Sequence, residues 1–206
     1  DPDEEVAELA RAELAELEER RNRLAEALER LYRANIDTRI FRGSLAVSNF
    51  RDIDPRAGTL DDMCELAAEM RKRGMLLTLD VVVNHTSSEH PWAQQARAGD
   101  SAYQDFYFCF PNRDVPDMFE ETMPEIFPET APGNFTWDEA MGKWVMTVFN
   151  TYQWDLNYYN PDVFIETADN ILFWANQGAD IIRLDAVAFL WKKIGTTCQN
   201  EQIGRV

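Results

Sequence analysis

The chain has 206 residues, which is room for one ordinary domain or for part of a larger one. Hydrophobic residues make up 45% and charged residues 28%, a balance typical of a globular protein and not of a disordered one. Acidic residues outnumber basic ones by 37 to 20, so the formal net charge is −17. This charge argues against nucleic acid or an anionic membrane as a partner, and no apolar run is long enough to predict a membrane-spanning helix.

Three scattered cysteines, Cys64, Cys109 and Cys198, fit neither a disulfide framework nor a four-ligand zinc site. We interpret them as reduced packing residues. The first residues show no secretory leader, because neither a basic segment nor an apolar one is present. Both observations favour a cytoplasmic protein, and no cluster of residues predicts a metal centre.

The N-terminal region, residues 3–34, contains neither glycine nor proline. Five leucines recur there in a helical rhythm: Leu14, Leu17, Leu24, Leu28 and Leu31. This pattern predicts a long helix that forms a segment of its own, 1–35, ahead of a second region, 36–206. A single helix of this length is only marginally stable in water unless its apolar face packs against another surface. We favour packing on its own domain over a dimerising coiled coil.

Two further helices are marked by their end signals. Thr59, with Asp62 three positions later, predicts a capped helix that ends at Gly74. Asn160-Pro161 predicts a helix that ends at Gly178, with asparagine as the cap and proline in the first turn.

An apolar run follows each of these two helices, at 75–83 and at 181–187. Such runs are typical of strands buried on both faces of a parallel sheet, and alternation of helix and strand predicts parallel α/β units. About 100 residues separate the two runs, far more than one crossover needs, so residues 86–158 are interpreted as an inserted subdomain.

Polar residues accompany both predicted strands. The first run continues through Asp80, Asn84 and His85, and the second contains Arg183 and Asp185 on the same face of the strand. A guanidinium favours the ionised form of a neighbouring carboxylate, and an oriented carboxylate is suited to attack an anomeric carbon. The alternatives are a structural histidine and a structural ion pair.

These segments resemble conserved regions of the α-amylase family of glycoside hydrolases and transglycosylases (glycoside hydrolase family 13). Residues 80–85 and 182–186 are similar to the first and second conserved regions, and 153–157 to a short motif near the end of the inserted domain. Further segments resemble the amylosucrase branch, which builds an α-1,4-glucan from sucrose and releases fructose: 86–92, 125–128, 147–157 and 191–200.

The resemblance implies a role for each matching residue. Asp185 would be the nucleophile of a retaining mechanism, with a covalent glucosyl intermediate, and Arg183 would orient it. His85 would hydrogen-bond hydroxyls of the transferred glucose, while Phe149 and Gln153 would line the cleft. The resemblance implies no organic cofactor.

Asp80 and Asn84 would be structural residues near the site, with Asp80 pairing near Arg183. Some family members bind calcium near the position of Asn84, and Asp155 with Asn157 would be the candidates here. The amylosucrase resemblance favours a site without metal.

The chain departs from the family pattern in extent and at two positions. A full (β/α)₈ barrel takes about 250 residues, so the fold expected here is a partial TIM barrel with the insert after the third strand. The general acid and the second stabilising carboxylate have no counterpart, and Arg42 and Leu45 stand where the family carries Asp and Tyr.

The leading interpretation is therefore a glucosyl-transferring enzyme for sucrose and α-glucans, or the part of one that bears the nucleophile. We expect the isolated chain to be nearly inactive and to need a complementing barrel half or a second copy, because open sheet edges are a liability. The alternative is a non-catalytic glucan-binding or assembly module.

Overall fold

The computed structural model describes residues 47–55 and 57–199, together with single positions between 8 and 22. The described single positions are helical, but most of the helix expected over 3–34 lies outside the described residues, as do Arg42 and Leu45. The chain divides into two compact units. The first comprises 1–42 and 52–76, and the second comprises 43–51 and 77–206.

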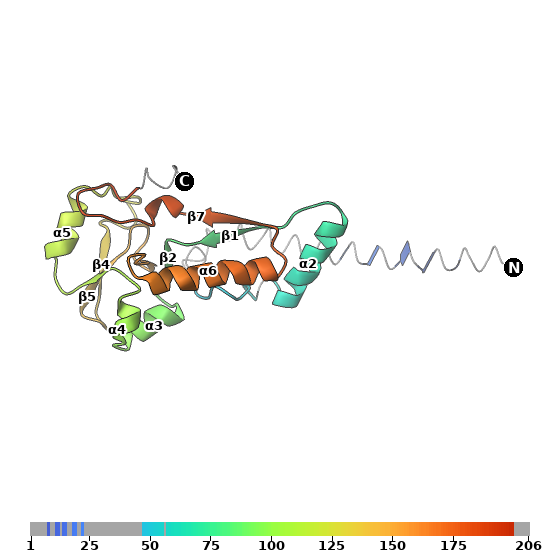
Figure 1. The fold of residues 1–206 in the computed structure, drawn as a ribbon, viewed down its shortest axis with the longest axis horizontal. Coiled ribbons are helices and arrows are strands. Elements are labelled where there is room, and N and C mark those ends of the chain that lie inside the picture. The colour runs from blue at the N-terminus through green and yellow to red at the C-terminus, as the bar shows by residue number, and fades with distance from the viewer. Residues whose placement is uncertain are drawn as a thin grey trace. The chain divides into compact units, whose positions relative to one another are not determined.

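Helix α2 (Leu60–Lys72) belongs to the first unit (Figure 1). The backbone N–H of Asp62 donates to the Thr59 hydroxyl at 3.2 Å, and the Thr59 N–H donates to the Asp62 carboxylate at 2.8 Å. This reciprocal cap satisfies two donors that a helix start leaves open. Gly74 follows the helix with a φ of +72°, which suits glycine. The sequence-based prediction of this helix is confirmed.

The second unit contains two parallel strands, β1 (Thr78–Val82) and β7 (Ile181–Asp185). Figure 1 shows them side by side, although paired residues lie 103 positions apart in the chain. Helix α6 (Pro161–Asn176) leads back to β7, and its cap Asn160 accepts a hydrogen bond from the N–H of Asp162 at 2.9 Å. The predicted helix and the predicted parallel pairing are both confirmed.

The prediction that both strands are buried on both faces is wrong. Val81 is buried, but Ile181 and Leu184 are 45% and 41% exposed. The reason is that, among the described residues, this sheet consists of β1 and β7 alone. Within the described residues each strand has one neighbour, so apolar side chains suited to a wider sheet remain accessible.

The segment between β1 and β7 folds around two small antiparallel sheets. One has the strand order β3-β5-β4, and the other pairs β2 with β6. The elements are β2 (His85–Ser87), α3 (Pro91–Arg97), α4 (Ser101–Gln104), β3 (Cys109–Phe110), α5 (Asp114–Glu120), β4 (Phe135–Asp138), β5 (Lys143–Met146) and β6 (Gln153–Asp155). A short 3₁₀ helix, η2 (Val187–Phe189), follows β7.

Two apolar clusters form the core of this segment. Tyr107, Trp154 and Leu156 belong to the first, and Phe119 and Met146 to the second. Because the antiparallel strands contribute side chains to both clusters, the insert holds β2 and β6 firmly beside the end of β1.

Cys64, Cys109 and Cys198 are not joined in disulfides. Cys198 is buried in the second cluster and Cys109 packs against the first, where burial raises the pKa of its thiol to about 12. For Cys109 and Cys198, these contacts agree with the interpretation as packing residues. Among the helices of the described part of the chain, none has the length and apolarity needed to cross a membrane.

Candidate active site

Arg183 connects two carboxylates across the parallel strands. Its guanidinium donates to Asp80 at 2.7 Å and to Asp185 at 3.1 Å. Asp80 lies opposite Arg183 in the middle of β1, whereas Asp185 is the last residue of β7 and lies opposite Val82. The side chains of Asp80, Arg183 and Asp185 are 57%, 59% and 46% exposed. The predicted juxtaposition of Arg183 and Asp185 on one face is confirmed, and the acid is accessible.

The chain turns sharply directly after Asp185. Ala186 has a φ of +55°, in the left-handed region that residues other than glycine rarely adopt. This conformation ends the strand at Asp185 and starts η2, which brings Phe189 toward the aromatic side chains of the insert. The carboxylate therefore stands at the carboxyl end of its strand.

His85 lies three residues beyond Val82, the strand partner of Asp185. It is buried, and its Nε2 lies 2.7 Å from the side-chain amide of Gln153. Its ring centroid lies 5.2 Å from that of Phe149. The structure thus brings together His85, Gln153 and Phe149, three of the residues that the sequence singled out.

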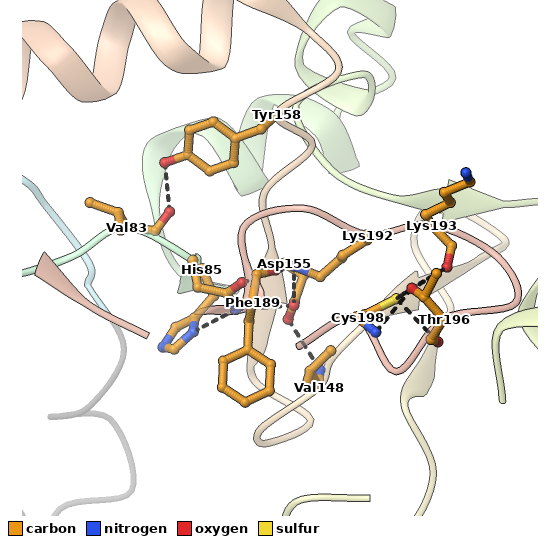
Figure 2. A network of polar contacts seen from close by, with 11 residues as sticks. Val83, His85, Val148, Asp155, Tyr158, Phe189, Lys192, Lys193, Thr196 and Cys198 are labelled. Carbon is orange, nitrogen blue, oxygen red and sulfur yellow. Dashed lines mark hydrogen bonds and ion pairs between the residues drawn. The ribbon is translucent and has the colours of Figure 1, made fainter. Parts of the chain in front are cut away.

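A buried cation, the ammonium of Lys192, lies near His85 (Figure 2). The ammonium of Lys192 lies 2.9 Å from the Asp155 carboxylate and donates to Asn84 Oδ1 at 2.8 Å and to the carbonyl oxygen of Phe189 at 2.6 Å. The side chains of Lys192 and Asp155 are fully buried. The second carboxylate oxygen of Asp155 accepts the N–H of Val148 at 3.1 Å. All of these charges are paired and hydrogen-bonded, as burial requires.

Sequence reasoning missed Lys192. It appeared only within a run that resembles the family, because a lone lysine carries no local sign of burial and its partner Asp155 is 37 positions away. Asp155 and Asn157, the candidates for calcium, are not joined: Asp155 pairs with Lys192, and the Asn157 amide donates to the carbonyl of Asp105 at 3.0 Å. In the described part of the chain, no group of three His, Cys, Asp or Glu residues is arranged to hold a metal ion.

A pocket of about 480 Å³ lies away from this group. It is lined by residues 49–51, residues 90–92 and three residues of α6. None of the site residues predicted from the sequence lines it. The candidate site is therefore defined by the ends of β1 and β7 and the neighbouring insert, not by this pocket.

Known proteins match this chain over most of its length. Residues 43–203 match the family model for the alpha amylase catalytic domain. The chain is 35% identical over 159 residues to a trehalose synthase of Pimelobacter sp. (strain R48), with 77% of the chain and 27% of that protein covered. It is 37% identical over 155 residues to a glucosylglycerate phosphorylase of Spirochaeta thermophila, with 74% and 24% covered.

A solved structure gives the same result. A mutant of MutB, the trehalulose synthase of Pseudomonas mesoacidophila MX-45, in complex with its substrate sucrose, matches with a TM-score of 0.64 and 32% identity, over 72% of this chain and 26% of that one. The chain spans about a quarter of the length of the relatives it matches. On the match over residues 43–203, this chain belongs to the alpha-amylase family, and that match covers a stretch of the family's catalytic domain.

Proposed function

We propose that this chain carries the nucleophile of a retaining, glucosyl-transferring enzyme, with Asp185 as that nucleophile. The observation that carries the proposal is the contact of Arg183 with Asp185, on an accessible carboxylate at the end of a parallel strand. The guanidinium holds one carboxylate oxygen, which fixes the orientation of the group. In α/β barrels, this end of the strands is where catalytic residues stand.

The chemical step follows from that geometry. A carboxylate oxygen of Asp185 attacks the anomeric carbon of an α-glucoside and forms a β-glucosyl ester, while the bond to the leaving oxygen breaks. The leaving oxygen takes a proton from a general acid. An acceptor hydroxyl then attacks the ester carbon, gives up its proton and restores the α-linkage.

Three neighbours are proposed to hold the sugar. The imidazole of His85 supplies a hydrogen bond to a hydroxyl of the bound glucose, and Gln153 supports that ring at 2.7 Å. Phe149 presents an aromatic ring beside them, a surface on which a sugar ring stacks well. Asp80 and Asn84 are structural: Asp80 fixes the other side of Arg183, and Asn84 bonds to Lys192.

Sucrose is the proposed donor, with an α-1,4-glucan and fructose as products. The runs that resemble the amylosucrase branch support this choice, as does MutB, a relative of known structure in complex with its substrate sucrose. We take β1 and β7 as neighbouring strands of a partial (β/α)₈ barrel. The general acid of a retaining enzyme stands about 5–5.5 Å from the nucleophile, and the family resemblance places it on a later strand. We therefore expect the 206-residue chain to turn over sucrose poorly.

A glucosyl fluoride tests the nucleophile without a general acid, because fluoride leaves without protonation. We expect the chain incubated with 5-fluoro-α-glucosyl fluoride to gain one fluoroglucosyl group, found by mass spectrometry on the peptide that contains Asp185. The Asp185→Asn variant should stay unlabelled. Glu139→Gln, which alters an exposed acid of the insert, is the matched control and should label normally. Labelling that persists in Asp185→Asn would refute the assignment.

A non-catalytic module is the second candidate, and the exposure of Ile181 and Leu184 favours it as an assembly surface. If the chain is such a module, sucrose or maltooligosaccharides should quench its tryptophan fluorescence, while the glucosyl fluoride should not label Asp185. Sedimentation at increasing concentration then reports whether copies associate through these open strands.

A further inference from the structure

The pocket of about 480 Å³ is a second place where the chain could bind a small molecule. Its volume falls within the range of small-molecule sites, roughly 300–1,000 Å³. Residues 49–51, residues 90–92 and three residues of α6 line it, and all of them belong to the second compact unit. None of them has a part in the proposed glucosyl transfer, so their polar groups call for a separate explanation.

Two side chains of the pocket carry hydrogen-bond donors although they are almost completely buried. His90 and Asn170 are each 4% exposed. His90 Nδ1 accepts the backbone N–H of Trp92 at 3.2 Å, so the proton of the neutral ring is on Nε2. Asn170 Oδ1 accepts Arg51 Nε at 2.7 Å, and because a guanidinium only donates, the free end of this amide is its NH₂ group. Burial lowers the pKa of His90 to about 4, which keeps its ring neutral at pH 7.

Neither donor has a hydrogen-bond acceptor among the described residues. Within the described part of the chain, the completely buried side-chain atom that lacks a partner is Asn134 Oδ1. The Nε2 of His90 and the NH₂ group of Asn170 therefore retain some accessible surface, and both residues line the pocket. A donor in such a place is satisfied only when water or a ligand in the pocket accepts its hydrogen bond.

The same pocket also offers acceptors. The Glu166 carboxylate makes no hydrogen bond or ion pair with any described residue, whereas Asp169 pairs with Arg51. Two carboxylates and one guanidinium give the lining a formal charge of −1, which disfavours an anion. The two N–H donors disfavour a cation, which would leave them without an acceptor. A hydroxyl group both accepts and donates, so a neutral molecule with several hydroxyls matches these groups.

Aromatic side chains add an apolar surface to the pocket. Phe50 is buried and Trp92 is partly exposed, and their ring centroids lie 5.4 Å apart. The Trp92 ring also lies 4.6 Å from that of His90, and the Trp174 indole donates to the Phe50 carbonyl at 2.7 Å, which holds this segment against α6. A sugar ring has apolar C–H faces and hydroxyls along its edge, so it suits an aromatic surface flanked by donors and acceptors.

We propose that this pocket is a second carbohydrate site, which binds a neutral sugar ring through the Nε2–H of His90, the NH₂ group of Asn170 and the carboxylate of Glu166. Trp92 supplies the surface on which the ring packs. The site binds sugar without a chemical step. It does not depend on the role of Asp185, because the groups that form it are separate from those of the proposed transfer.

Three monosaccharides test the class of ligand: D-glucose, D-glucuronate and D-glucosamine, which share a ring and differ in charge. The readout is nitrogen NMR of the two histidine rings in the ¹⁵N-labelled chain, with His90→Asn to assign the signals. At about pH 6 the ring of His90 is still neutral, and glucose should shift its Nε2 signal in a saturable manner. Each charged sugar should need a concentration at least roughly 10-fold higher.

Two outcomes of this titration would overturn the proposal. One is the absence of a saturable glucose shift at His90, including a response at His85 alone, which would place the sugar near Asp185. The other is a stronger response to glucuronate or glucosamine than to glucose. Failure of the unmodified chain to label at Asp185, by contrast, would refute the proposed function and leave the glucose result standing.

Two substitutions test the binding groups themselves. Glu166→Ala removes a carboxylate that has no protein partner, and Asn170→Asp keeps the oxygen that faces Arg51 but replaces the donor by an acceptor. Each should weaken glucose binding roughly 10- to 100-fold. Glu139→Gln, at an exposed acid outside the pocket, is the matched control and should bind glucose as the unmodified chain does. Unchanged glucose affinity in a folded Glu166→Ala chain would contradict the proposal, even if Asn170→Asp does not fold.

Discussion

The ammonium of Lys192 lies 2.9 Å from the carboxylate of Asp155, and neither side chain has any exposed surface. Each charge relies on the other, because water reaches neither. Loss of one partner of a buried ion pair costs about 3–5 kcal/mol, since an uncompensated charge remains inside. We therefore expect Lys192→Met to lower the free energy of unfolding by about that amount, measured by urea denaturation.

A double-mutant cycle checks that this loss comes from the pair. Asp155→Asn in the Lys192→Met background removes both charges, so the double variant should be less destabilised than the sum of the two single variants. Lys193→Met should change stability by less than about 0.5 kcal/mol, as exposed substitutions usually do. Simple additivity of the two single variants would contradict the coupling.

For the Arg183 contacts we expect a small effect on stability and a larger effect on the labelling of Asp185. All three partners are about half exposed, so Arg183→Gln should cost no more than about 1 kcal/mol of stability. A hydrogen bond to a charged group contributes about 1.5–3 kcal/mol, and its loss at Asp185 should slow labelling by the glucosyl fluoride roughly 10- to 100-fold. Equal labelling rates for the variant and the unmodified chain would show that Arg183 does not act on the proposed nucleophile, Asp185.

His90 makes stability depend on pH. Burial lowers the pKa of its imidazole from 6.5 to about 4. Below pH 6.5 the unfolded chain binds a proton at His90 that the folded chain does not bind until about pH 4. Stability from this residue is thus complete above pH 6.5 and is lost as the pH falls toward 4, by at most about 1.4 kcal/mol per pH unit. Urea midpoints at pH 7 and pH 5 should lie closer together in His90→Asn than in the unmodified chain.

The cap of α2 gives a local test in the other compact unit. Thr59→Ala removes the hydroxyl that accepts the Asp62 N–H and should destabilise that helix by about 1 kcal/mol. Thr59→Ser keeps an acceptor and should be nearly neutral. Hydrogen exchange of the amides of residues 60–63 measures the effect, and equal protection in both variants would be inconsistent with the cap.

The starts of two helices could be predicted because the capping residues that mark them act within a few positions of the chain. Thr59 with Asp62, and Asn160 with Pro161, place two helix starts at the observed residues, since capping depends on groups three positions apart. Burial of the strands was mispredicted, because it depends on how many neighbours a strand has. The run at 181–185 is suited to a wider sheet than the described residues contain.

In the candidate site, too, a contact between residues close in sequence could be predicted, whereas contacts between distant residues could not. Arg183 and Asp185 are two positions apart on one strand, so alternation of side chains predicts their contact. Lys192 gave no such signal, because two of its three oxygen partners, Asn84 and Asp155, are distant in sequence and only Phe189 is close to it. Only tertiary structure brings Asn84 and Asp155 to the ammonium.

The pairing of β1 with β7 across 103 positions also bears on how quickly the chain folds. Closing an unstructured loop of this length costs on the order of 4 kcal/mol of chain entropy, and distant contacts of this kind slow folding. The hairpin of β4 and β5 joins residues close in sequence and shortens that loop when it forms first. We therefore expect Asp185 to reach its place beside Val82 late, after the insert has become ordered, so that Gln153 and Phe149 are in position before the proposed nucleophile.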